Sequence, residues 1–171
     1  MREILFRGFH QFSDEELGDP DGTLFCSDVN PTEIVLNGKK LKGIWLTGNL
    51  ISDKGEDPLI VGDSADTCSE YVALEWWAPV IPGTIGQFTG LCDKNGKQIF
   101  EGDVVGFEDG MSTESGYAES FRCTGCVFWD KETASFQVDN RLSAESYEVL
   151  EECAIIGNIY DGPELIKNEH H

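Results

Sequence analysis

The 171-residue chain carries 32 Asp and Glu residues against 12 Lys and Arg residues, which gives a formal net charge of −20 at pH 7. A surface this acidic repels phosphate backbones and anionic membranes, so nucleic-acid binding and membrane binding are disfavoured. The charge serves solubility, and it attracts basic protein surfaces and divalent cations. Hydrophobic residues make up 40% of the chain, which excludes a wholly disordered protein.

Nineteen glycines and six prolines interrupt the sequence, a pattern that favours many short strands over long helices. No segment reaches the roughly 18–20 apolar residues of a membrane helix, and residues 1–8 lack the apolar run of a signal peptide. We therefore expect a cytoplasmic protein. Residues 169–171 resemble the start of a purification tag and are set apart from the fold.

The chain begins with a predicted strand at residues 1–9, in which apolar and charged residues alternate. Residues 10–32 are rich in Asp, Glu, Gly, Pro and Ser, which predicts a loop. Within it, Ser13 and Glu16 have the spacing of a capping box, which favours one helical turn.

A hairpin follows, because Asn37-Gly38 is a strong turn signal between apolar runs at residues 33–36 and 39–51. After a polar, acidic stretch, residues 71–80 form an apolar run that is typical of a buried strand. A second strong turn signal, Asn95-Gly96, lies within residues 84–105 and predicts another hairpin.

Residues 108–119 are acidic and rich in glycine and serine, and we expect them to be irregular and mobile. Residues 121–129 and 134–138 alternate as a strand pair, with the turn at residues 130–133. Residues 142–150 suit either a short helix or an irregular segment, and a last strand is predicted at residues 154–160.

The stretch from Thr84 to Val105 resembles the central signature of the YopX family, which is found in phages and prophages. The opening residues 1–8 and the late residues 155–165 resemble two further blocks of that family. Residues 43–48 resemble its tryptophan-containing strand. The residues that carry the signature are Gly86, Gln87, Thr89, Gly90, Asp93, Asn95, Gly96, Glu101, Gly102, Asp103, Gly157 and Asn158. The family has no established biochemical activity.

The resemblance implies a mainly β fold of antiparallel strands in barrel-like sheets. Together with the pattern of turns, it predicts a single domain over residues 1–168, with about five to nine short strands and one or two short helices. Acidic insertions near residues 10–32 and 108–119 depart from the family pattern. The resemblance also implies a phage or prophage origin.

Six cysteines are present, and only Cys123 and Cys126 have the spacing of metal ligands. A zinc site would need two further ligands, and a redox pair would sit where a strand meets a helix. Small, partly buried free thiols are the third interpretation, and it is the one we favour.

An acidic set near the signature turn, Asp93, Asn95, Glu101 and Asp103, begins like a calcium loop but does not continue as one. Turn chemistry explains Asp93 and Asn95 equally well. His10 is the only histidine outside the terminus, and no serine has the context of a nucleophile. We therefore expect no catalytic residues and no cofactor.

Trp76 and Trp77 would point to opposite faces of a strand, so one of them should lie outside the local core. They are the candidate contacts of a protein-interaction module, whose partner is another protein or a second copy of this chain. The alternatives are an acidic DNA-mimic inhibitor of a nucleic-acid-binding protein and, as a third hypothesis, a metal-dependent enzyme.

Overall fold

The computed structural model describes residues 3–18, 31–52, 57–112 and 118–161, so residues 169–171 lie outside the described part. The chain divides into two compact units, here called the first unit (Ile4–Gln87) and the second unit (Met1–Glu3 with Phe88–His171). Each unit has strands and a core of its own. The assignment of residues 1–168 to one domain remains a prediction.

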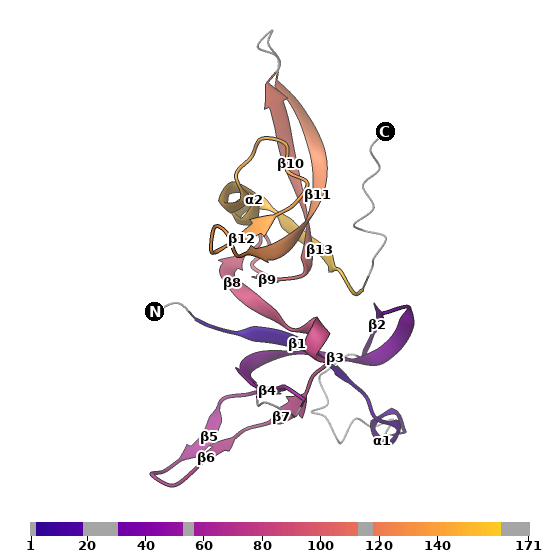
Figure 1. Cartoon of the computed structure of the whole chain (residues 1–171), viewed down its shortest axis with the longest axis vertical. Coiled ribbons are helices and arrows are strands. Elements are labelled where there is room, and N and C mark those ends of the chain that lie inside the picture. The colour runs from indigo at the N-terminus through magenta and orange to yellow at the C-terminus, as the bar shows by residue number, and fades with distance from the viewer. Residues whose placement is uncertain (1–2, 19–30, 53–56, 113–117, 162–171) are drawn as a thin grey trace. The chain divides into compact units, whose positions relative to one another are not determined.

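The described residues form thirteen strands, two α-helices and one 3-10 helix (Figure 1). In chain order these are β1 (Phe6–Gln11), α1 (Asp14–Leu17), β2 (Thr32–Leu36), β3 (Lys39–Ile51), β4 (Leu59–Val61), β5 (Ser64–Thr67), β6 (Val72–Leu74), β7 (Trp77–Pro79), η1 (Pro82–Thr84), β8 (Gly86–Cys92), β9 (Gln98–Phe100), β10 (Asp103–Ser112), β11 (Ala118–Asp130), β12 (Ser135–Val138), α2 (Ser146–Glu152) and β13 (Ala154–Asn158). The prediction of five to nine strands was too low, because short strands were merged with their neighbours.

The prediction of a mainly antiparallel β fold is confirmed, and the sheets of the described residues are open and do not close into a barrel. In the first unit the strand order is β7–β4–β3–β1, residues Gly86 and Gln87 at the start of β8 pair with β1, and β2 pairs with β3. The predicted turn joins β2 to β3, with φ of 51° at Asn37 and 76° at Gly38. The capping box of Ser13 and Glu16 is also present and begins α1.

The core of the first unit depends on close approach between β1 and β3. Phe9 and Ile44 are fully buried there, and the Trp45 ring meets the Phe9 ring edge-on at a centroid distance of 5.3 Å. Gly43 lies opposite Gln11, and a Cβ atom at Gly43 would stand 2.0 Å from the carbonyl oxygen of His10. Only glycine fits at this position.

In the second unit, β12, β11, β10 and β13 form an antiparallel sheet, while β8 pairs with β9. Helix α2 packs against this sheet and contributes to one hydrophobic cluster. The buried members of the cluster are Ile99, Val105, Phe107, Val127, Val138, Val149, Leu150 and Cys153. The expectation of an irregular segment at residues 108–119 was wrong at both ends, because β10 runs to Ser112 and β11 starts at Ala118.

A test of the close approach between β1 and β3 is the substitution Gly43→Ala. It should lower the free energy of unfolding by about 1–3 kcal/mol, because the added methyl group must displace backbone and not a flexible side chain. Urea unfolding followed by tryptophan fluorescence measures the effect. Gly83→Ala is the matched control, because nothing lies within 4 Å of a Cβ atom there; equal stability of the two variants would contradict the account.

Candidate functional site

The signature residue Asp93 is a buried acceptor for three backbone N–H groups. Its Oδ1 atom accepts hydrogen bonds from Asn95 N at 2.8 Å and Lys97 N at 2.9 Å, and its Oδ2 atom accepts one from Ile155 N at 3.0 Å. Burial raises the pKa of Asp93, but these hydrogen bonds outweigh it and hold the pKa below its usual value. The carboxylate therefore closes the turn between β8 and β9 and ties it to β13.

Other signature residues have similar local roles. Thr89 donates its hydroxyl proton to Ile99 O at 3.0 Å, and Asp103 accepts a hydrogen bond from Phe100 N at 2.8 Å. Three signature glycines occupy the left-handed region, where a side chain would be strained: Gly90 (φ 90°), Gly96 (φ 81°) and Gly102 (φ 86°). Of the pair Asn95-Gly96, only Gly96 has positive φ.

The remaining signature residues lie on strands or in turns. Asn158, at the end of β13, accepts hydrogen bonds from Tyr160 N at 2.8 Å and Asp161 N at 2.9 Å. Gly86 and Gln87 begin β8, Glu101 lies in the turn before β10, and Gly157 is paired with Val104. The described signature residues therefore lie in turns and on strands, where their hydrogen bonds and backbone conformations are structural.

Cys123 and Cys126 both lie on β11, three residues apart. Side chains alternate between the two faces of a strand, so this spacing sends the two sulfur atoms to opposite faces. Burial raises the pKa of Cys126 to about 11, with Asp139 adding to the effect, so the thiol stays protonated at neutral pH. Across the described ranges, no group of three or more His, Cys, Asp or Glu residues could hold a metal ion.

His10 is buried in the first unit and links three elements. Its Nδ1 atom lies 2.7 Å from Pro79 O on β7, and its Nε2 atom lies 3.0 Å from Glu16 Oε1 on α1. Both partners are acceptors, so each ring nitrogen makes its bond only when it carries a hydrogen. This pairing uses both ring nitrogens for structure, beside a pocket of about 850 Å³ on the first unit.

The first unit also carries an exposed aromatic surface. Strands β5 and β6 form a two-stranded hairpin, and Trp77 begins β7 just after it. We call residues 63–77 the aromatic arm. Four large side chains of the arm are exposed, at 63% for Trp77, 62% for Val72, 55% for Tyr71 and 37% for Trp76.

The prediction of one buried strand at residues 71–80 was therefore wrong, because the segment forms two short strands in which only Ala78 and, just after them, Val80 are buried. The strand is interrupted between β6 and β7, and Trp76 lies at this interruption. The Trp76 ring packs over Gly62, and the Trp76 carbonyl oxygen accepts a hydrogen bond from Gly62 N at 3.0 Å. Both tryptophans reach the surface, where strand alternation had predicted only one.

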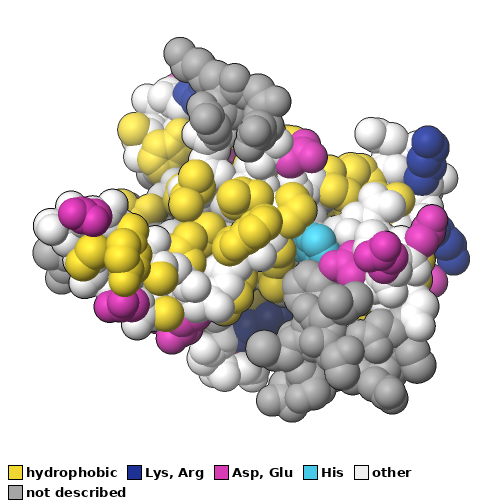
Figure 2. Space-filling model, turned by 90° about the horizontal axis from the view of Figure 1, so that it is seen from below, with side chains coloured by type: hydrophobic (Ala, Val, Ile, Leu, Met, Phe, Trp, Pro, Cys, Tyr) yellow, Lys and Arg dark blue, Asp and Glu magenta, His cyan; other side chains and the backbone are white. Residues whose placement is uncertain are grey.

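Carboxylates surround the exposed aromatic side chains of the arm. Asp63, Asp66, Glu70 and Glu75 are all exposed, and the sequence from Asp57 to Pro79 contains no Lys, Arg or His. Figure 2 shows hydrophobic side chains gathered across this face, with Asp and Glu side chains at their margins. An apolar surface with an anionic margin fits an apolar, basic partner.

Sequence reasoning missed Asp109, a second buried carboxylate. It accepts hydrogen bonds from Leu142 N at 2.7 Å and Ala144 N at 3.1 Å, and these bonds outweigh burial and lower its pKa. A signal was present, because Asp109 shares the face of its strand with Val105 and Phe107. A carboxylate on the buried face indicates a structural acceptor.

Comparisons with known proteins show a family and a solved structure to which this chain is similar. The family model described as "YopX protein" matches residues 40–167. The crystal structure of protein EF1440 from Enterococcus faecalis is similar at 21% identity, with a TM-score of 0.47, over 82% of this chain and 100% of that chain. No curated protein matches the sequence significantly.

The role of Asp93 is tested by Asp93→Asn, which should lower the free energy of unfolding by about 1–3 kcal/mol at neutral pH. The side-chain amide introduced by this substitution has an NH2 group in place of one carboxylate oxygen. That NH2 group would face at least one of the three backbone N–H groups, so that two donors would oppose each other. The folded pKa of Asp93 lies below its usual value of 3.8, so the carboxylate stabilises fully above that value. This contribution is lost as the pH falls through the folded pKa, so the difference from the unsubstituted protein should shrink in acid.

Urea unfolding at neutral pH and at about pH 3 measures this difference. Glu132→Gln is the control, because Glu132 is exposed in the turn after β11. A stability of Asp93→Asn that matches the control at neutral pH would show that the carboxylate is dispensable.

Proposed function

Because the chain belongs to the YopX protein family, we propose that it is a phage- or prophage-derived accessory protein that works in the cytoplasm as a non-enzymatic protein-interaction module. The aromatic arm is its contact surface. The observation that carries the proposal is the exposure of Trp77, Trp76, Tyr71 and Val72 on one short segment. Large exposed apolar patches are typical of protein-interaction sites, and tryptophan and tyrosine are the commonest anchors there.

The charges of the arm favour a basic partner. Four carboxylates flank the aromatic side chains, and one of them, Asp66, accepts a hydrogen bond from the Tyr71 hydroxyl at 3.0 Å. Two copies of this arm would bring like charges together, which disfavours a homo-oligomer through this surface. No helix in the described part of the chain is long and apolar enough to cross a membrane.

The proposal predicts that Trp77→Ala weakens binding of the partner at least about tenfold, as expected for a central tryptophan anchor. The immobilised protein is exposed to bacterial lysate, and bound proteins are identified and quantified by mass spectrometry. Trp129→Ala is the matched control, because Trp129 is also exposed but lies on β11 in the second unit.

The supporting result is a basic protein that the unsubstituted chain and Trp129→Ala both retain, that Trp77→Ala loses and that rising salt releases. An identical set of bound proteins for all three chains would contradict the proposal. Sedimentation of the purified protein at low and moderate salt tests whether the chain forms a homo-oligomer. If it does, and if Trp77→Ala dissociates the oligomer, the partner of the arm is a second copy of this chain and not a basic protein.

A further inference from the structure

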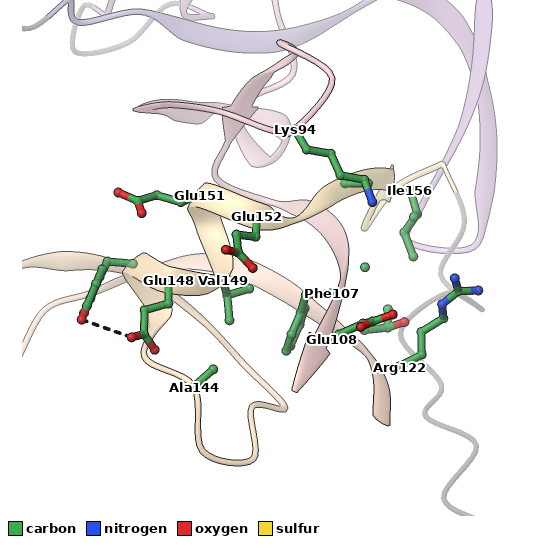
Figure 3. A pocket seen from close by; sticks show the side chains of 14 residues that line it. Lys94, Phe107, Glu108, Arg122, Ala144, Glu148, Val149, Glu151, Glu152 and Ile156 are labelled. Atoms are coloured by element: carbon green, nitrogen blue, oxygen red, sulfur yellow. Dashed lines mark hydrogen bonds between the residues drawn. The ribbon is translucent and has the colours of Figure 1, made fainter. Parts of the chain in front are cut away.

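The second unit has a groove of about 960 Å³ that none of the signature residues lines. It lies between helix α2, strand β13 and the outer parts of β10 and β11 (Figure 3). Its walls carry six charged side chains and several apolar ones. The charged residues are Lys94, Glu108, Arg122, Glu148, Glu151 and Glu152.

The groove exists because β10 is longer than the strand beside it. The pairing of β10 with β13 ends at Gly106 opposite Ala154, and the preceding chain forms α2 and does not continue along β10. On that edge, β10 runs on from Phe107 to Ser112 without a strand partner among the described residues. An open edge of this kind is a template for another strand.

Hydrogen bonds elsewhere show which backbone groups face the open edge. Cys126 N donates to Asp139 Oδ1 at 2.6 Å, and Cys126 O accepts from Asp139 N at 3.1 Å, so both backbone groups of Cys126 point away from β10. Val104, the residue opposite Cys126, therefore points its own N–H and C=O away from β11.

Along a strand, the backbone N–H and C=O groups of successive residues point alternately to one edge and to the other. The backbone groups of Gly106, Glu108 and Gly110 therefore point to the same edge as those of Val104. Gly106 is paired with Ala154, and the Gly110 carbonyl accepts a hydrogen bond from the Ser143 hydroxyl. Glu108 lies between them, and its N–H and C=O face the groove. They offer one donor and one acceptor to an added chain.

The charges on the groove walls have a direction. Glu148, Glu151 and Glu152 line the α2 wall, with Glu152 directed into the groove and Glu151 turned away from it, and Figure 3 shows Lys94 and Arg122 across from them, with Glu108 beside Arg122. Neither Lys94 nor Arg122 makes an ion pair with another described residue. Helix α2 contains no cation, so its three glutamates are not neutralised within the helix.

We propose that the groove binds an extended segment of a partner protein, which adds as a short strand beside Glu108 and places Lys or Arg side chains against the glutamates of α2. Main-chain hydrogen bonds to Glu108 align the segment, and the exposed side chains of Ile156 and Tyr147 contact its apolar residues. This mode is strand addition, in which the backbone supplies affinity and side chains supply specificity. The site uses no residue of the aromatic arm.

The test uses the full chain labelled with 15N and two synthetic peptides of eight residues. One peptide alternates threonine and valine and carries two lysines, and the other carries glutamates in place of the lysines. The lysine peptide should shift the amide signals of Gly106, Glu108 and Glu151, and it should slow hydrogen exchange at the Glu108 amide. The glutamate peptide should bind at least about tenfold more weakly.

The double variant Glu151→Gln/Glu152→Gln should weaken binding of the lysine peptide about fivefold or more, because it removes two charges from the α2 wall. Glu132→Gln, which removes a charge outside the groove, should bind the peptide as the unsubstituted chain does. The proposal is overturned if neither peptide shifts the groove amides, if the two peptides bind alike, or if exchange at Glu108 does not slow.

Discussion

Buried carboxylates that accept backbone N–H groups are the interaction on which the second unit depends. Asp93 joins the β8–β9 turn to β13, and Asp109 joins β10 to the chain that leads into α2. A charge removed from water costs several kcal/mol unless hydrogen bonds replace its hydration, and here each carboxylate accepts at least three. The same bonds orient α2 and β13, and therefore shape the groove between them.

The residues that stabilise the fold are therefore different from the exposed residues that are available to bind a partner. The signature residues lie in turns and on strands, where their hydrogen bonds and positive φ angles are structural. The aromatic arm and the α2 glutamates lie outside the signature and face solvent. The signature residues therefore support the architecture, whereas the exposed surfaces of this chain carry the proposals about partners.

Local chemistry made several elements predictable from sequence. Asn37-Gly38 and the pair Ser13 and Glu16 have side chains and backbone preferences that act within four residues, and both formed as expected. The turn chemistry of Asp93 followed from the same kind of reasoning. Its bond to Ile155, 62 positions away, could not, because it depends on the packing of β13 against β10.

The failures have a common physical origin in tertiary context. Residues 71–80 are apolar enough for a buried strand, but the fold buries only Ala78 and Val80 among them, and Trp77 and Val72 stay exposed. The acidic composition of residues 108–119 suggested a loop, but pairing between β10 and β11 gives residues 108–112 and 118–119 a regular backbone. Composition alone did not reveal that Asp109 would be surrounded by N–H donors.

The most direct test of the structural role of the buried carboxylates is a 13C NMR titration of the aspartate side chains in the folded protein. The account predicts that Asp93 and Asp109 titrate below their usual pKa of 3.8, because backbone N–H groups stabilise the charged form. A titration of either residue at or above 3.8 would show that burial outweighs the hydrogen bonds and would contradict the account.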